Sequence, residues 1–78
     1  MANGGIIITI MIEFSVRLRK VLKDTNTSQL ALAKKIGMSQ SVVNNYCTGK
    51  REPTLDVLAL ICKALNESAD YLLGLTKW

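Results

Sequence analysis

The sequence predicts an all-α fold of five short helices, and three features of its pattern carry that prediction. Apolar residues recur at helical spacing from residue 14 onward. Each later helix is preceded by a Ser or Thr that can cap its start, and Gly follows several of the helix ends. The single Pro lies between two predicted helices, and 78 residues suffice for one domain only. We divide the chain into an N-terminal arm, residues 1–13, and a domain, residues 14–78.

The arm begins with the small residues MANGG and continues with the β-branched run IIITIMI at residues 6–12. Such a run favours a β-strand, although it lacks the polar alternation of a half-buried strand. A lone strand cannot pair its own backbone groups, so we expect it to pair with the same segment of a second copy. The alternatives are a strand that lies on its own domain and a frayed leader, with Met11 as an internal start.

The domain is predicted to contain five helices joined by short loops. In chain order they span residues 14 to about 25, 28–36, 39–48, 54–66 and 68–73. The residues expected to face the core are Phe14, Leu18, Val21, Leu22, Leu32, Ala33, Ile36, Val43, Tyr46, Leu55, Leu58, Ile61, Cys62, Leu65, Leu72 and Leu73.

The composition favours some function classes and excludes others. Ten Lys and Arg against six Asp and Glu give a net charge of +4, which favours a polyanionic partner without proving one. The chain has no His, so neither a zinc finger nor a Cys/His nucleophile pair can form. We therefore expect no metal, no cofactor, no small-molecule substrate and no enzymatic activity.

Cys47 and Cys62 do not resemble the disulfide framework of a secreted domain, and we expect both thiols to be buried in a reducing compartment. The apolar run at residues 6–12 is far too short to span a membrane, and no Lys or Arg precedes it as in a signal peptide. The sequence thus predicts a cytoplasmic protein without a membrane partner.

The most informative feature is the connection between the second and third predicted helices. Only Gly37 and Met38 separate them, which is the geometry of a helix-turn-helix. If Val43 and Tyr46 point inward, one face of the third helix protrudes from the domain. The outward side chains are then Gln40, Ser41, Asn44 and Asn45. These amides and hydroxyl can hydrogen-bond to base edges, whereas a merely solvated helix usually carries Glu and Lys.

Residues 27–55, TSQLALAKKIGMSQSVVNNYCTGKREPTL, and the downstream CKALNESADYLLGL resemble the phage repressor-like helix-turn-helix proteins of the Cro/CI or XRE type. The matched positions are Ser28, Gln29, Ala33, Gly37, Ser39, Tyr46, Gly49, Lys50 and Pro53. The resemblance implies a five-helix, lambda-repressor-like domain that binds double-stranded DNA and regulates transcription, with repression as the expected mode.

The same resemblance implies which side chains contact bases. Gln40 and Ser41, early in the third helix, would face bases, and Asn45 is similar to a second base-contacting position. Asn44 lies at the edge of that position and would contact either base or backbone. Adenine is the natural partner of Asn and Gln.

It also implies which residues contact phosphates. Gln29 would touch a phosphate and brace the first recognition residues through its amide. The family also contacts phosphates at the positions of Ser39, which precedes a helix N-terminus, and of the charged Lys50 and Arg51. Tyr46 is expected in the core, with its hydroxyl near the surface.

The chain departs from the family pattern in its surface apolar residues. The departures are Leu30, Val42, Val57 and Leu60, and Leu75 and Trp78 add to the same apolar surface. Together they suggest a self-association surface, and scattered apolar residues are the alternative. Cys47 also stands where the family commonly has an acidic residue.

The mechanism that follows is occupancy of an operator by a homodimer. Two copies on a twofold axis can place their third helices in successive major grooves about 34 Å apart. The alternative is an antitoxin-like or accessory module that binds a protein through the same helices, with DNA contact secondary.

Overall fold

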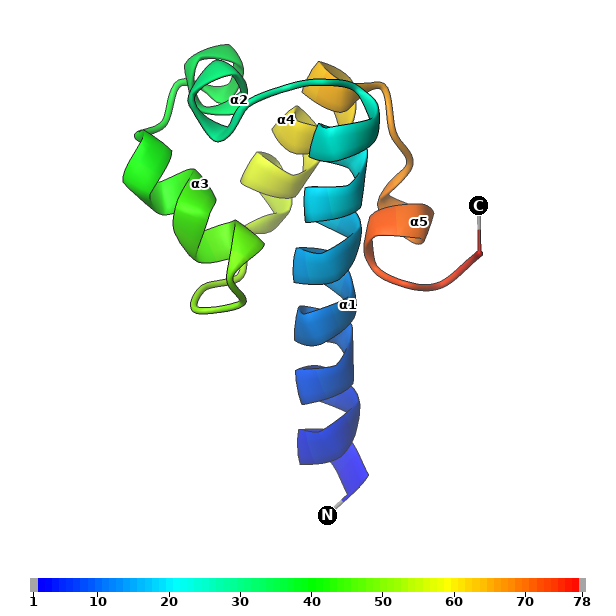
Figure 1. Ribbon diagram of the computed structural model, residues 1–78. Coiled ribbons are helices and arrows are strands. Elements are labelled where there is room, and N and C mark those ends of the chain that lie inside the picture. Colours follow the sequence, from blue (N-terminus) through cyan, green and yellow to red (C-terminus); the bar gives the residue numbers. More distant parts are fainter. Residues whose placement is uncertain (1, 78) are drawn as a thin grey trace.

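The computed structural model describes residues 2–77, with the backbone alone at residues 2–4 and 7, and it confirms the all-α fold with five helices. They are α1 (Ala2–Asp24), α2 (Gln29–Ile36), α3 (Gln40–Cys47), α4 (Leu55–Leu65) and α5 (Ala69–Leu72). Figure 1 shows α1 as the long central helix, with α2 and α3 on one side of it and α5 on the other. The first half of α1 projects beyond the other helices.

The prediction of a strand at residues 6–12 is wrong, because this segment is the first half of α1. A strand would need a partner for its backbone groups, whereas a helix satisfies them internally. Adding turns to an existing helix also costs much less than nucleating one, and β-propensity depends strongly on context. Helix α1 passes through residues 13 and 14 without a break, so the division into arm and domain stays a prediction.

The core lies where α1 to α5 converge, and it contains most of the predicted residues. The buried apolar side chains are Phe14, Leu18, Val21, Leu22, Leu32, Ala33, Ile36, Val43, Tyr46, Cys47, Ile61, Leu65 and Leu72. Leu58 and Cys62 are partly buried against this cluster. The helical periodicity of the sequence thus identified the core faces of α1, α2, α3 and α5.

Leu55 is the main error in the predicted core, since its side chain is 84% exposed. It is the first residue of α4, directly after the cap Thr54, and the helix starts there before it reaches the core. Of the residues predicted as surface apolar, Leu30, Leu60 and Leu75 are exposed. Val42 and Val57 instead pack partly against the core, and Trp78 lies outside the described residues.

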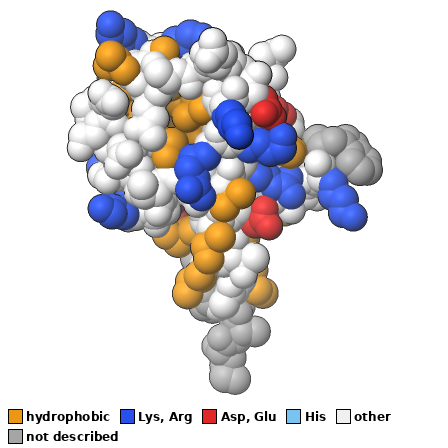
Figure 2. Space-filling model, in the orientation of Figure 1, with side chains coloured by type: hydrophobic (Ala, Val, Ile, Leu, Met, Phe, Trp, Pro, Cys, Tyr) orange, Lys and Arg blue, Asp and Glu red, His pale blue; other side chains and the backbone are white. Residues whose placement is uncertain are grey.

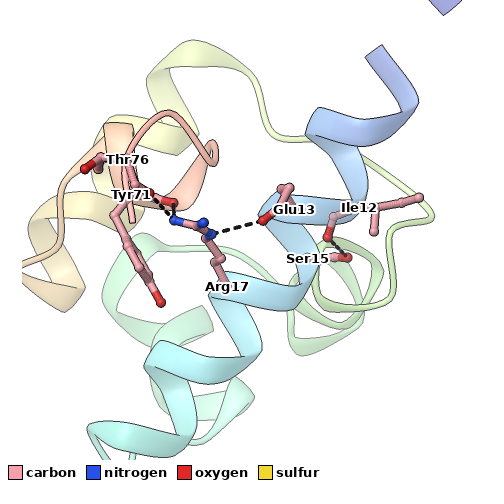
Figure 3. Close-up of polar contacts among 6 residues, drawn as sticks. All are labelled: Ile12, Glu13, Ser15, Arg17, Tyr71 and Thr76. Atoms are coloured by element: carbon pink, nitrogen blue, oxygen red, sulfur yellow. Dashed lines mark hydrogen bonds and ion pairs between the residues drawn. The ribbon is translucent and has the colours of Figure 1, made fainter. Parts of the chain in front are cut away.

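Arg17 fixes the C-terminal segment to the middle of α1. Its Nη1 donates to the backbone carbonyl of Tyr71 at 3.0 Å and to that of Thr76, and its guanidinium lies 4.6 Å from the centre of the Tyr71 ring (Figure 3). Its Nε pairs with Glu13 at 3.0 Å. Because Tyr71 lies in α5 and Thr76 follows it, one side chain holds both α5 and the residues after it.

Candidate nucleic-acid interface

The turn between α2 and α3 is fixed by Gly37, which adopts a left-handed conformation with φ of 71°. The N–H of Met38 donates to the carbonyl of Ala33 at 2.9 Å and closes the end of α2. Residues other than Gly and Asn rarely take this conformation, so the Gly ends α2 and lets α3 start after two further residues. The predicted helix-turn-helix is therefore present.

Serine hydroxyls cap both helices of this unit. Ser28 Oγ accepts from the N–H of Ala31 at 3.0 Å, and Ser39 Oγ accepts from the N–H of Val42 at 3.2 Å. The N–H groups of the first helical turn have no acceptor inside their own helix, so those left over at the exposed start of α3 are available to an anion. Ser39 thus acts locally as a cap.

The inner face of α3 packs against the core. Val43, Tyr46 and Cys47 are buried, and Met38 packs against the same cluster from the turn. The hydroxyl of Tyr46 lies 3.8 Å from the sulfur of Met38. Tyr46 is therefore a core residue, as predicted, and its hydroxyl is directed at the turn.

The outer face of α3 carries the four side chains predicted to contact bases. Gln40, Ser41 and Asn44 are exposed, and Asn45 is half-buried. None of the four is charged, and each ends in an amide or a hydroxyl. A helix ridge with these groups has the hydrogen-bonding capacity that recognition of base edges requires.

Gln29 and Asn44 are joined across the two helices. The Asn44 amide nitrogen donates to the Gln29 side-chain oxygen at 3.2 Å, between the first residue of α2 and the middle of α3. The bond restricts both side chains to one relative position. The Gln29 amide thus contacts Asn44, in the middle of α3, whereas the resemblance implied contact with the first residues of that helix.

Lys50 and Arg51 lie in the loop that follows α3, and both are exposed. Their backbone N–H groups donate to the carbonyl of Asn45, at 3.0 and 3.3 Å. Gly49 permits the reversal with a φ of 77°, and a Cβ placed on it would lie 3.6 Å from the Ser15 hydroxyl oxygen. The backbone of the loop therefore stays beside the C-terminal end of α3.

Thr48 extends this outer face and was not among the predicted residues. It is exposed, and its hydroxyl donates to the carbonyl of Asn44 at 3.0 Å. The spacing of Ser41, Asn44 and Thr48, at i, i+3 and i+7, is the signal that could have identified it. The eight predicted site residues lie at the start of α2, at the cap of α3, on α3 itself, or in the loop that follows it.

The two thiols are neutral groups in this fold. Burial raises the pKa of the Cys47 thiol, and burial together with the nearby Glu67 carboxylate raises the pKa of the half-buried Cys62 thiol. Since Cys47 is buried, it contributes packing volume and no charge to the outer face.

A helix-turn-helix family model, HTH_3, matches residues 18–72, which include all of α2, α3, α4 and α5. The chain belongs to this family of XRE-type helix-turn-helix proteins. Members of the family are DNA-binding transcriptional regulators. The Ser39 cap, the turn at Gly37 and the exposed face of α3 all lie within the matched residues.

Two proteins of Bacillus subtilis (strain 168) are similar to this member of the family. One is described as the uncharacterized HTH-type transcriptional regulator YobD and the other as the uncharacterized HTH-type transcriptional regulator YqaE. Each is 37% identical over 60 residues, which is 77% of this chain. Those residues are 54% of the first relative and 52% of the second, so the chain spans about half the length of the relatives it matches. No solved structure matches the chain significantly.

Two other kinds of site were sought in the part of the chain that the structure describes. Within residues 2–77, no three acidic or Cys side chains come together as a metal-binding group would require. Among the same residues, no helix has the length and apolar character needed to cross a membrane.

Proposed function

We propose that this helix-turn-helix protein is a sequence-specific repressor that inserts α3 into the major groove of DNA as a homodimer. The observation that supports this most is the outer face of α3, where uncharged amides and hydroxyls are exposed and Asn44 is held by Gln29 at 3.2 Å. Held side chains lose less freedom on binding than mobile ones, which favours specific contacts.

In this proposal the side chains divide into two groups. Gln40, Ser41, Asn44 and Asn45 contact base edges, and Thr48 extends that row. The phosphate contacts come from Gln29, from the start of α3 at Ser39, and from Lys50 and Arg51. Base contacts determine which sequence is bound, whereas phosphate contacts determine position and most of the salt dependence.

A homodimer is proposed because one such module offers few contacts, and paired modules add theirs. Two copies place their α3 helices in successive major grooves about 34 Å apart, which requires an approximately palindromic site. Repression follows when the bound dimer occupies a site that polymerase needs. Such a regulator acts in the cytoplasm, where its DNA lies.

The test is selection of bound sites from a pool of random duplexes. We expect an enriched, approximately palindromic sequence whose half-sites are one helical turn apart, because each half-site receives one α3. Enrichment of no sequence, with equal affinity for all duplexes, would contradict the proposal.

A protein-interaction module, antitoxin-like or accessory, is the second candidate, and the exposed Ile6, Leu55 and Leu75 favour it. Salt-titrated binding to random duplex DNA separates the two functions. With Lys50 and Arg51 on each of two subunits, the regulator is expected to lose about 100-fold in affinity between 50 and 200 mM salt. The interaction module, whose DNA contact is secondary, is expected to bind duplex DNA only weakly at both concentrations.

A further inference from the structure

One apolar stripe of α1 continues from the core into the projecting half of the helix. Its members are Leu18, Phe14, Ile10 and Ile6, spaced by four residues, and their side chains are 0, 4, 37 and 57% exposed. Residues at this spacing lie on one face of a helix. The face that forms the core therefore extends outward, past the point where its own subunit covers it.

A groove lies beside this stripe, where α1 leaves the domain. It is about 400 Å³ in volume and is lined by Ile10, Met11 and Phe14 of α1, by Glu52 to Leu55 and Leu58 at the start of α4, and by Leu73. Leu55 stands at its edge and is 84% exposed. Figure 2 shows hydrophobic side chains along the projecting part of α1, whereas the Lys and Arg in this view lie on the rest of the molecule.

We propose that this groove and the Ile6–Ile10 stripe form the homodimer interface, with the stripe of a second copy lying against Leu55 of the first. This proposal rests on the homodimer in the proposed function and names its surface. The stripe and the groove belong to one continuous face, and a twofold axis brings this same face of both copies together. Such an interface ends at two copies and does not extend into a filament.

The size of the surface approaches that of a standard dimer interface. Residues 2–13 form a helical cylinder about 18 Å long and about 11 Å wide, with a lateral surface of about 600 Å². A standard interface buries about 800 Å² on each partner, which is about 15% of the 5224 Å² surface of this chain. The part of the cylinder that faces the partner, together with the groove, Leu55 and Leu58, brings the contact toward that size.

The charge distribution favours a second copy as the occupant. Residues 2–12 contain no Lys, Arg, Asp or Glu, so identical helices meet without repulsion between side chains. A helix that binds a lipid surface usually carries Lys and Arg on its polar face, and this segment has none. The groove does not include Gln40, Ser41 or Asn44, so the outer face of α3 stays free for DNA.

The test compares two substitutions on the same helix. Ile6→Glu and Ile8→Glu change side chains that are 57 and 58% exposed, two residues apart, so they point in different directions from one helix. We expect Ile6→Glu to raise the dimer dissociation constant by at least about tenfold, as for a side chain at the centre of an interface. Ile8→Glu is expected to leave it within about threefold of the wild-type value. Sedimentation equilibrium of the full chain without DNA measures both, and circular dichroism checks that helix content is kept.

A second pair tests the opposite side of the groove and does not depend on α1. Leu55→Glu places a carboxylate at the start of α4, where the helix dipole favours it, and Leu60→Glu changes another exposed position of the same helix. We expect Leu55→Glu to weaken the dimer and Leu60→Glu to leave it unchanged.

Several results would overturn the inference. They are a wild-type chain that is monomeric at high micromolar concentration, equal effects of Ile6→Glu and Ile8→Glu, and an unchanged dimer in Leu55→Glu. A different result would contradict the proposed function, namely that the protein shows no preference for any DNA sequence. A dissociated Ile6→Glu variant should still prefer the selected half-site, with lower affinity for the full site.

Discussion

The Asn44 side-chain amide donates a hydrogen bond to the side-chain oxygen of Gln29 at 3.2 Å, and this bond links the outer face of α3 to the first residue of α2. The two residues are 15 positions apart, so the bond exists only because Gly37 and Met38 turn the chain tightly. The proposed recognition surface therefore depends on both helices, and a change in α2 should alter how α3 binds.

Gln29→Ala should weaken binding to the selected site by about 2- to 10-fold, the effect of one lost hydrogen bond of about 0.5–1.5 kcal/mol. Fluorescence anisotropy with labelled duplex measures it. In a double-mutant cycle with Asn44→Ala the two losses should not add, because each change breaks the same bond. Additive losses would show that Gln29 acts independently of Asn44.

Asn45→Ala and Lys50→Ala should separate sequence preference from general affinity. The first should relax base preference at one position of each half-site by about 1–3 kcal/mol. The second should weaken binding to all duplexes alike and reduce the salt slope by about 1 per subunit. Affinity measurements on selected and random duplexes compare them, and equal losses on both duplexes for both variants would refute the division.

Arg17→Met should lower the free energy of unfolding by about 2 kcal/mol, because charged hydrogen bonds to two carbonyls and a cation–π contact are lost together. Urea denaturation measures the change. Arg19→Met is the matched control, since Arg19 is exposed and, among the described residues, its side chain bonds only to the Ser15 carbonyl of its own helix, at 3.3 Å. A similar loss in both variants would mean that Arg17 does not hold α5.

The stabilising effect of Cys47 should decrease at high pH. Burial raises the pKa of this thiol in the folded state, so the folded chain keeps a proton that the unfolded chain loses. The contribution is complete below the unfolded thiol pKa, about 8.5, and is lost as pH rises toward the higher folded pKa. Above that pH, the unfolding free energy of the wild-type protein should therefore fall toward that of the Cys47→Ala variant, as measured by urea denaturation at a series of pH values. If the difference between the two proteins stays constant with pH, the effect is disproved.

The sequence predicted the helices after α1, the turn and the core faces well, because each rests on local chemistry. Ser28 and Ser39 act as caps, Gly37 takes the left-handed conformation, and Val43 and Tyr46 point inward as helical spacing requires. These signals act within a few residues. Local pattern therefore sufficed to place the candidate interface.

Ile8 and Leu55 mark where local pattern failed. The β-branched run around Ile8 has strand propensity, but α1 was already formed by core packing at Phe14 and Leu18, and it extends through the run. Leu55 fits the apolar face of α4, yet as the first residue of that helix it is 84% exposed, while Val57 and Leu58 already pack partly against the core. The conformation of the Ile8 segment and the exposure of Leu55 both depend on how far the neighbouring helices extend. The Asn44–Gln29 distance likewise depends on how α2 packs on α3.

The central claim is that the outer face of α3 enters the major groove, and an NMR titration of the labelled protein with the selected duplex tests it most directly. The account predicts the largest amide shift changes at residues 39–45 and 48–51 and at Gln29, with little change in α5. Changes concentrated on α4 and α5, with residues 39–45 unaffected, would contradict it.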